Sequence, residues 1–250
     1  MRFRLLVEYE GTRYRGWQVQ PGCRTVQGEL VKAAESAAGK PVRELMGAGR
    51  TDAGVHALGQ VAHLDLDTRI PPATLLHRLN DALPPDIAVV RLEVVPARFH
   101  ARHDAVSRTY LYQISRRRTA FGKKLVWWVK DPLDLESMRA AAGRLAALRD
   151  FAGFTAAEGE TRVDLQELSL AEVGSLVLVR ARASHFLWKM VRRLVGALVE
   201  VGRGAVPPAR VAALRSAEHT APPSGLFLER VSYPGDPPDP PAEPVLRIRG

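Results

Sequence analysis

Apolar and polar residues alternate along some stretches of the chain and recur at helical spacing along others. Alternation around Leu5, Val7 and Tyr9 predicts a strand, because every second side chain of a strand faces the same side. Thr25 precedes a run with helical spacing and predicts a helix N-cap. In chain order, the elements predicted for the first half are strand 2–10, a helix from Thr25 to Gly39, strand 42–46, strand 60–66, helix 71–83 and strand 87–95.

The second half repeats this pattern more loosely. Its predicted elements are strand 108–115, helix 135–148, strands 165–173 and 176–183, helix 185–201 and strand 226–233. The βαββαβ order of the first half is typical of ferredoxin-like (RNP-like) folds with an antiparallel sheet. We therefore expect an α+β protein whose two ferredoxin-like halves pack side by side around a basic cleft. The expected domains are residues 1–105 and 106–236, and the Pro-rich residues 237–250 should form an extended arm.

Charge adds information about the partner. Lys and Arg number 36 against 27 Asp and Glu, so the net charge is +9. A basic enzyme concentrates polyanions around itself, and nucleic acid is the commonest such partner. The single cysteine, Cys23, excludes an intramolecular disulfide and a Cys-based zinc site. Since the sequence has neither signal-peptide features nor a membrane-length apolar run, we expect a cytoplasmic protein without a membrane partner.

The densest cluster of chemically suggestive residues is Gly47–Ala57, GAGRTDAGVHA. It has glycines where the backbone could approach a ligand, but it departs from a dinucleotide fingerprint because Asp52 takes the third glycine position and no helix follows. A plain structural turn is the alternative. Arg50 and Asp52 are two residues apart, so on an extended loop they face the same side. A phosphate site should not have a carboxylate at its centre, so we interpret Asp52 as a chemical group that Arg50 keeps ionised and oriented.

Several motifs share one family resemblance. They are GAGRTDAGVHALGQVAH from Gly47, YEGTRYRGWQ from Tyr9, RFHAR from Arg98, RTYLY from Arg108, FLWKMVR from Phe186, GLFL from Gly225, and Tyr233-Pro234. Together they resemble the TruA-type tRNA pseudouridine synthases, over about residues 3 to 234. The Pro-rich tail lies outside the family pattern.

The resemblance implies a role for each of five residues. Asp52 would be the catalytic aspartate with Arg50 beside it, and Tyr110 would pack against the target base. Arg192 would be the basic residue that pairs with the aspartate, and Leu226 would line the pocket. The resemblance further implies a homodimer that acts on uridines at positions 38, 39 and 40 in the anticodon stem-loop of tRNA. Neither metal nor nucleotide nor other cofactor is expected.

The expected reaction breaks the glycosidic bond, turns the uracil and reattaches it through carbon. A carboxylate could attack the uracil ring, attack the sugar carbon or remove a sugar proton, and the sequence does not choose among these three. The base must first leave its stack, a cost that stacking on Tyr110 and phosphate contacts would offset. Tyr112 lies on the same face of the strand as Tyr110 and is also a candidate for stacking on the base.

Basic side chains suggest where the RNA backbone would bind. On the helix predicted from His185, residues Lys189, Arg192 and Arg193 are spaced to form a basic edge, either solvated or lining a groove. The candidates for phosphate contacts are Arg13, Arg15, Arg24, Lys189 and Arg193.

Two other functions fit parts of the pattern. Tandem ferredoxin-like domains can bind RNA without catalysis, but the RNP1 pattern is absent from this sequence. A metal-dependent nuclease could use Asp52 with Asp65 or Asp67, and it would predict magnesium-dependent strand cleavage. The histidines have no carboxylate at metal-ligand spacing, so we do not expect them to bind a metal.

Overall fold

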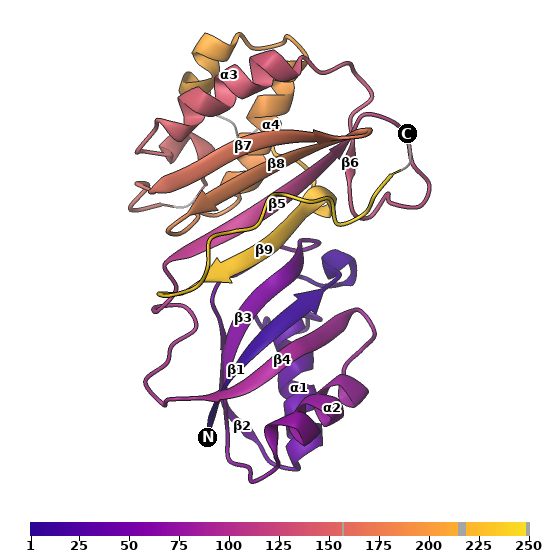
Figure 1. The fold of residues 1–250 in the computed structure, drawn as a ribbon, viewed down its shortest axis with the longest axis vertical. Coiled ribbons are helices and arrows are strands. Elements are labelled where there is room, and N and C mark those ends of the chain that lie inside the picture. The colour runs from indigo at the N-terminus through magenta and orange to yellow at the C-terminus, as the bar shows by residue number, and fades with distance from the viewer. Residues whose placement is uncertain (157, 215–218, 249–250) are drawn as a thin grey trace. The chain divides into compact units, whose positions relative to one another are not determined.

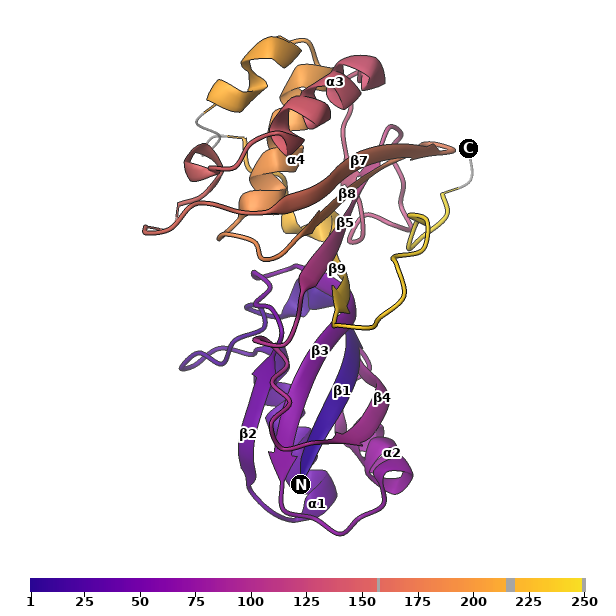
Figure 2. The same ribbon diagram turned by 60° about the vertical axis from the view of Figure 1, so that its left-hand side comes forward.

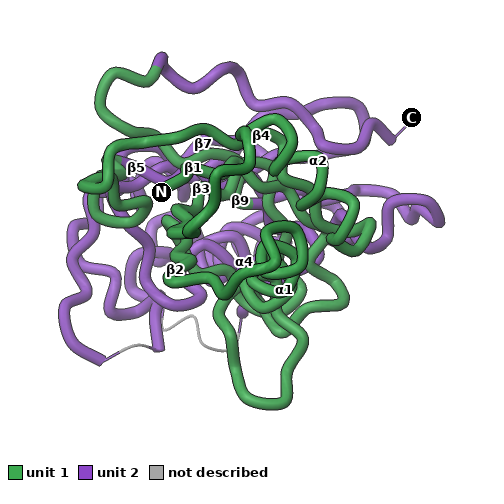
Figure 3. Tube along the Cα trace, turned by 90° about the horizontal axis from the view of Figure 1, so that it is seen from below, with its two compact units in different colours: residues 1–106, 228–236 green, residues 107–227, 237–250 purple. Residues whose placement is uncertain are grey.

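The computed structural model describes residues 1–156, 158–214 and 219–248. They form a mixed α+β protein of two compact units (Figure 3). Unit 1 comprises Met1–Val106 and Leu228–Asp236, and unit 2 comprises Ser107–Phe227 and Pro237–Gly250. The expected domains assigned residues 228–236 to the second half, whereas these residues lie in unit 1. The reason is that strand β9 (Leu226–Ser232) begins in unit 2 and continues in unit 1.

Unit 1 has the predicted βαββαβ order (Figure 1). Its elements are β1 (Arg2–Tyr9), the short 3-10 helix η1 (Gly11–Arg13), α1 (Val26–Ala38), β2 (Val42–Gly47), β3 (His56–Leu66), α2 (Pro72–Ala82) and β4 (Ile87–Val95). The strands pair in the order β4-β1-β3-β2, and every one of these pairs is antiparallel. Strand β3 begins four residues earlier than predicted, so it starts directly after the loop that carries Asp52.

Local sequence explains these elements. Leu5 and Val7 are fully buried on one face of β1, as the alternation predicted. Helix α1 begins where the hydroxyl of Thr25 accepts a hydrogen bond from the backbone N–H of Gly28. The helix ends at Gly39, whose φ of 65° is the left-handed conformation that glycine adopts without strain. The sheet and helices of unit 1 thereby hold the loop between β2 and β3 on a fixed support.

Unit 2 is built around three antiparallel strands and two helices. Its elements are β5 (Ser107–Ser115), β6 (Trp127–Trp128), α3 (Leu135–Ala146), η2 (Ala152–Phe154), β7 (Leu165–Val173), β8 (Leu176–Ala183), α4 (Met190–Gly202), η3 (Pro208–Ala213), η4 (Pro223–Gly225) and the start of β9. The strands β5, β8 and β7 pair in that order, and β6 pairs in parallel with β5. Helices α3 and α4 cover one face of these strands (Figure 2).

The predicted start of the last helix at His185 is wrong. Helix α4 begins at Met190, and the residue before it, Lys189, has a left-handed φ of 60°. The backbone N–H of Met190 closes a tight turn on the carbonyl of Leu187, and the ring of Phe186 meets that of Tyr110 edge to face at 5.1 Å. This tertiary contact holds the segment before the helix in a non-helical conformation that helical periodicity could not predict.

The tail has no helix or strand over residues 237–248, but it packs on unit 2 and does not form a separate arm. The hydroxyl of Thr109 donates to Asp239 at 2.6 Å, and the amide of Val245 donates to Oε1 of Gln113 at 2.7 Å. Ile248 is buried in a hydrophobic cluster with residues of β5 and β8. The tail crosses the sheet face opposite α3 and α4 (Figure 2). The physical reason is that this face is partly apolar and needs a cover.

Candidate active site

The residues 48–55, which we call the Asp52 loop, join β2 to β3 in unit 1. Arg50 is exposed on this loop and Asp52 is half-buried. The side chain of Gln60, which is fully buried on β3, braces the start of the loop. Its Nε2 donates to the carbonyl of Gly49 at 2.7 Å, and its Oε1 accepts from the N–H of Gly49 at 3.3 Å. The loop is therefore tied to a rigid strand three residues before Asp52.

The residue before Asp52 is fixed from two sides. The hydroxyls of Tyr9 and Thr51 lie 2.8 Å apart in the protein interior, and the backbone N–H of Trp17 donates to the carbonyl of Thr51 at 3.1 Å. Burial raises the pKa of Tyr9 well above its ordinary value, so its phenol stays protonated and available for this hydrogen bond. After Asp52 the chain turns at once, since the N–H of Val55 donates to the carbonyl of Asp52. These contacts hold the backbone at Asp52 in one conformation.

A second segment, residues 11–17, packs directly on the Asp52 loop. A Cβ atom at Gly11 would lie 1.9 Å from the carbonyl oxygen of Val55, so only glycine fits there. Gly16 has a φ of 96°, and a Cβ atom there would lie 2.5 Å from the carbonyl oxygen of Thr51. The N–H of Gly11 also donates to Nδ1 of the buried His56 at 3.0 Å. The motif YEGTRYRGWQ thus supports the loop that carries Asp52.

Four of these supporting residues were not assigned a role by the sequence analysis. They are Tyr9, Thr51, His56 and Gln60. All four lie within the motifs YEGTRYRGWQ and GAGRTDAGVHALGQVAH, and this was the only indication of their role in the sequence. Which of them touch each other depends on the pairing of β1 with β3, because that pairing places Tyr9 opposite Ala57.

The other three candidates, Tyr110, Arg192 and Leu226, lie in unit 2. Arg192 is half-buried on α4, and its Nε donates to the carbonyl of Ala221 at 2.7 Å. The backbone N–H of Ala221 in turn donates to the carbonyl of Arg192 at 3.0 Å. Leu226, five residues beyond Ala221, is buried as the first residue of β9. The first turn of α4 therefore anchors the segment that leads to Leu226.

Tyr110 and Tyr112 occupy different environments although both lie on β5. Tyr110 retains a little exposure, 7%, and its ring contacts Phe186. Tyr112 is completely buried, and its hydroxyl donates to the carbonyl of Pro222 at 2.8 Å. Burial holds the pKa of Tyr112 well above its ordinary value. Tyr112 is therefore a core residue, and Tyr110 remains the candidate for contact with a base.

The predicted basic edge of the last helix is wrong for two of its three members. Lys189 precedes α4, and its ammonium nitrogen lies 4.4 Å from the ring centre of Trp188. Arg193 is only 7% exposed, and burial lowers the pKa of its guanidinium. Within the described residues, Nε of Arg193 has no hydrogen-bond partner. Arg193 therefore does not form a solvated edge with Arg192 and does not suit a surface phosphate contact.

The geometry of unit 1 argues against the nuclease alternative. Asp52 lies just before β3, whereas Asp65 lies near the other end of that strand, about 30 Å from His56 at the usual rise of a strand. Asp65 is also engaged in a bidentate pair with Arg2, with distances of 2.7 and 2.6 Å. Asp67, one residue beyond the strand, faces Lys40 and Arg43. Neither acid can share a metal ion with Asp52.

Comparison with known proteins identifies the family of this chain. The family model described as tRNA pseudouridine synthase matches residues 5–104 and 141–234. The chain belongs to this family. A protein of Paramagnetospirillum magneticum named tRNA pseudouridine synthase A is 43% identical over 244 residues, which cover 93% of this chain and 95% of that protein. A second of that name, from Rhodopseudomonas palustris, is 40% identical and covers 93% of this chain and 99% of that protein.

A third relative of the same name, from Myxococcus xanthus, is 41% identical over 95% of this chain and 94% of its own length. The members of this family are isomerases that convert uridine in tRNA to pseudouridine. The first stretch that matches the family model includes the Asp52 loop, and the second includes Arg192 and Leu226. Tyr110 falls between the two stretches, so its assignment depends on the RTYLY motif.

Proposed function

We propose that this chain isomerises uridines at positions 38, 39 and 40 in the anticodon stem-loop of tRNA, with Asp52 as the catalytic carboxylate. The observation that carries the proposal is the rigid support of the Asp52 loop. Buried contacts from Tyr9, Trp17 and Gln60 fix the peptides around a half-buried carboxylate. Such rigidity is typical of a catalytic group that must be held near a reacting atom.

The reaction is an isomerisation, so its atoms and electrons balance within the nucleoside. The glycosidic N–C bond breaks, the uracil turns and a C–C bond forms. The ring carbon then loses a proton, and the released ring nitrogen gains one. Asp52 would serve as a nucleophile toward the ring, as a nucleophile toward the sugar carbon, or as a base toward a sugar proton. All three routes need an ionised carboxylate close to the nucleoside.

Unit 2 would contribute the groups that hold the target base. In this proposal Tyr110 stacks on the uracil, Arg192 is the basic partner of the aspartate, and Leu226 lines the pocket. Arg50 would flank Asp52. Support comes from the family motifs and from the anchoring of Arg192 and the start of β9 by Ala221. Tyr110 at 7% exposure is more accessible than the fully buried Tyr112, which favours it as the aromatic residue that meets a base.

The proposal also includes the arrangement of the two halves and the oligomeric state. We infer two ferredoxin-like halves side by side around a basic cleft, a fold that the element order of unit 1 and its sheet order support. We further propose a homodimer in which one protomer supplies Asp52 while the other helps to hold the tRNA body. Light scattering tests this, and a monomer that remains active at high dilution would overturn it.

We propose the cytoplasm as the location, since tRNA is the substrate. Among the described residues, helices long and apolar enough to cross a membrane are absent. Fractionation of cells that carry the tagged chain would test the location directly.

The test of the function is Asp52→Asn, measured as pseudouridine in tRNA before and after treatment with the purified protein. The change keeps the size of the side chain and removes its charge. Pseudouridine should fall below detection while tRNA affinity stays similar or tightens, because a carboxylate facing a polyanion is lost. Asp67→Asn is the matched control, since it removes an exposed carboxylate from the same unit. A well-folded Asp52→Asn protein with normal turnover would overturn the assignment.

The same assay separates the two alternatives. A non-catalytic RNA-binding module would bind tRNA and leave its uridines unchanged. A metal-dependent nuclease would shorten the RNA on a sizing gel and stop when a chelator is added. Pseudouridine in RNA of full length contradicts both.

A further inference from the structure

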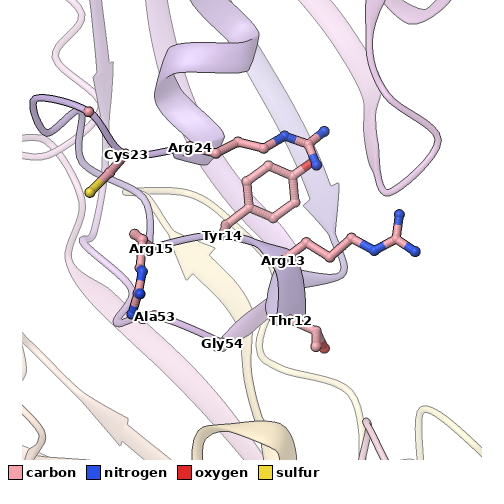
Figure 4. Close-up of a pocket in the computed structure, with 9 residues that line it drawn as sticks. Thr12, Arg13, Tyr14, Arg15, Cys23, Arg24, Ala53 and Gly54 are labelled. Carbon is pink, nitrogen blue, oxygen red and sulfur yellow. The ribbon is translucent and has the colours of Figure 1, made fainter.

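Unit 1 contains a pocket of about 540 Å³ beside the Asp52 loop (Figure 4). Its lining comes from three segments of the chain, residues 12–15, 22–24 and 53–54. Arg13, Arg15 and Arg24 bring three positive charges to this lining, which includes no acidic residue. A pocket with this charge suits an anionic ligand.

Arg13 and Arg15 have unneutralised charges. Within the described part of the chain, neither guanidinium has an ion pair or a hydrogen bond. Elsewhere in unit 1, in contrast, Arg2 lies 2.6 Å from Asp65. Arg4 similarly lies 3.7 Å from Glu93. The pocket thus keeps two guanidinium groups available, whereas those of Arg2 and Arg4 are already paired.

The third arginine helps to form a rigid wall. The guanidinium of Arg24 lies 4.8 Å from the ring centre of Tyr14 and 3.7 Å from Oε1 of Glu29. The hydroxyl of the buried Tyr14 donates to Asp86. Because Arg24 covers the ring of Tyr14, as Figure 4 shows, that ring is not available as a stacking platform for a base. The chemistry of the pocket therefore favours a phosphate over a base.

The three chain segments that line the pocket, residues 12–15, 22–24 and 53–54, are linked by backbone hydrogen bonds. The backbone N–H of Arg15 donates to the carbonyl of Arg24 at 2.9 Å, and the N–H of Gly54 donates to the carbonyl of Tyr14 at 3.3 Å. A pocket held in this way loses little conformational entropy when a ligand binds. Its wall at Ala53 and Gly54 follows Asp52 directly in the chain, so an occupant lies next to the catalytic loop.

We propose that this pocket binds a phosphodiester group of the substrate RNA strand, next to the target uridine. Arg13 and Arg15 would contact the phosphate oxygens, with Arg24 as the fixed positive wall. The site would position the strand so that the target nucleotide reaches Asp52. This inference rests on the proposed function, because it takes RNA as the ligand.

The first test is the affinity of Arg13→Gln and Arg15→Gln for a short anticodon stem-loop RNA and for whole tRNA. Each change should raise Kd by about tenfold for both RNAs, since a charge-assisted hydrogen bond is lost. The slope of log K against log salt should become shallower by about one. Arg43→Gln is the matched control, because Arg43 is an exposed arginine of unit 1 outside the pocket. Unchanged Kd and slope in both pocket variants, with normal melting temperatures, would overturn the proposal.

The second test uses Cys23, which lines the pocket, is exposed and is the single cysteine of the chain. Saturating stem-loop RNA should slow the alkylation of Cys23 by iodoacetamide at least about fivefold, because the bound strand covers the thiol. The Asp52→Asn protein should show the same protection. An alkylation rate that RNA leaves unchanged would overturn the proposal.

These outcomes are distinguishable from failure of the proposed function. If the natural chain makes no pseudouridine, the function fails whatever happens at Cys23. If it makes pseudouridine while Cys23 is unprotected and the pocket variants bind normally, only the phosphate site is wrong.

Discussion

The phenol of Tyr9 lies 2.8 Å from the hydroxyl of Thr51, the residue that precedes Asp52 in the chain. Both side chains are buried, and Tyr9 is the last residue of β1, a strand that pairs on both of its edges. This hydrogen bond therefore adds to those of Gln60 in coupling the position of the Asp52 backbone to the sheet of unit 1. A reacting group loses much of its effect when it is displaced by about 1 Å, so this contact should matter for turnover.

We predict that Tyr9→Phe lowers kcat by about 10- to 100-fold with little change in KM. The variant keeps the ring and removes the hydroxyl, so the hydroxyl of Thr51 loses its partner in the interior. The free energy of unfolding should fall by about 1–3 kcal/mol for the same reason. Single-turnover formation of pseudouridine and thermal unfolding measure the two effects.

Tyr233→Phe is the matched control for this prediction. The hydroxyl of Tyr233 donates to the carbonyl of Ala101 at 2.6 Å, also in the interior of unit 1 but outside the Asp52 loop. Its loss should reduce stability by a similar amount and change kcat by less than about twofold. If the two variants lose kcat equally, general destabilisation explains the effect and positioning does not.

The elements that could be predicted from the sequence were those whose bounds are set by neighbouring residues in the chain. The apolar runs of β4, β7 and β8 have the predicted bounds, and Thr25 caps α1 as its position indicated. The start of α4 was missed because the conformation of Lys189 depends on contacts distant in sequence, among them Phe186 with Tyr110. Periodicity describes one element at a time and carries no information about such contacts.

The same limit applies to the site and to the tail. Asp52 and Arg50 could be singled out because their loop has an unusual composition. The support from Tyr9 and Gln60 could not be derived, since it depends on which strands pair. In the tail, prolines dominated the composition and concealed the apolar residues Val245 and Ile248, which pack on unit 2.

We predict that the tail stabilises unit 2 through Ile248. This side chain is 9% exposed in a cluster that includes Leu111 and Leu178. Ile248→Ala should lower the free energy of unfolding by about 2–4 kcal/mol, because apolar contacts are lost and a cavity remains. Arg247→Ala changes the exposed neighbour and should shift stability by less than about 0.5 kcal/mol. Equal melting temperatures for the two variants would show that the tail is not a structural cover.

We predict that Arg193→Met raises stability. Arg193 is 7% exposed, and no described residue forms a hydrogen bond with its Nε. A methionine of similar length would fill the space without a buried charge or an unpaired Nε–H group, so the free energy of unfolding should rise by about 1–3 kcal/mol. Differential scanning calorimetry measures this change.

Arg203→Met is the comparison for that variant. Arg203 lies 2.9 Å from Asp131 and 2.8 Å from Glu200, so its charge is already paired near the surface. Its replacement should lower stability slightly, by up to about 1 kcal/mol. A lower melting temperature for Arg193→Met would mean that the buried guanidinium is satisfied in solution, and the prediction would fail.

The last prediction concerns pH and the imidazole of His100. Burial, together with the nearby charges of His63 and His103, lowers the pKa of His100, and Glu44 and Asp104 oppose this shift only in part. The unfolded chain therefore binds more protons than the folded chain below about pH 6.5, so stability falls as the pH decreases from there toward the folded pKa. His100→Asn keeps an acceptor for the backbone N–H groups of residues 102 and 103, and it should show a smaller loss of melting temperature between pH 7.5 and 5.5. His77→Asn, which changes an exposed histidine of α2, should retain the full loss, and an equally reduced loss in that variant would contradict the assignment to His100.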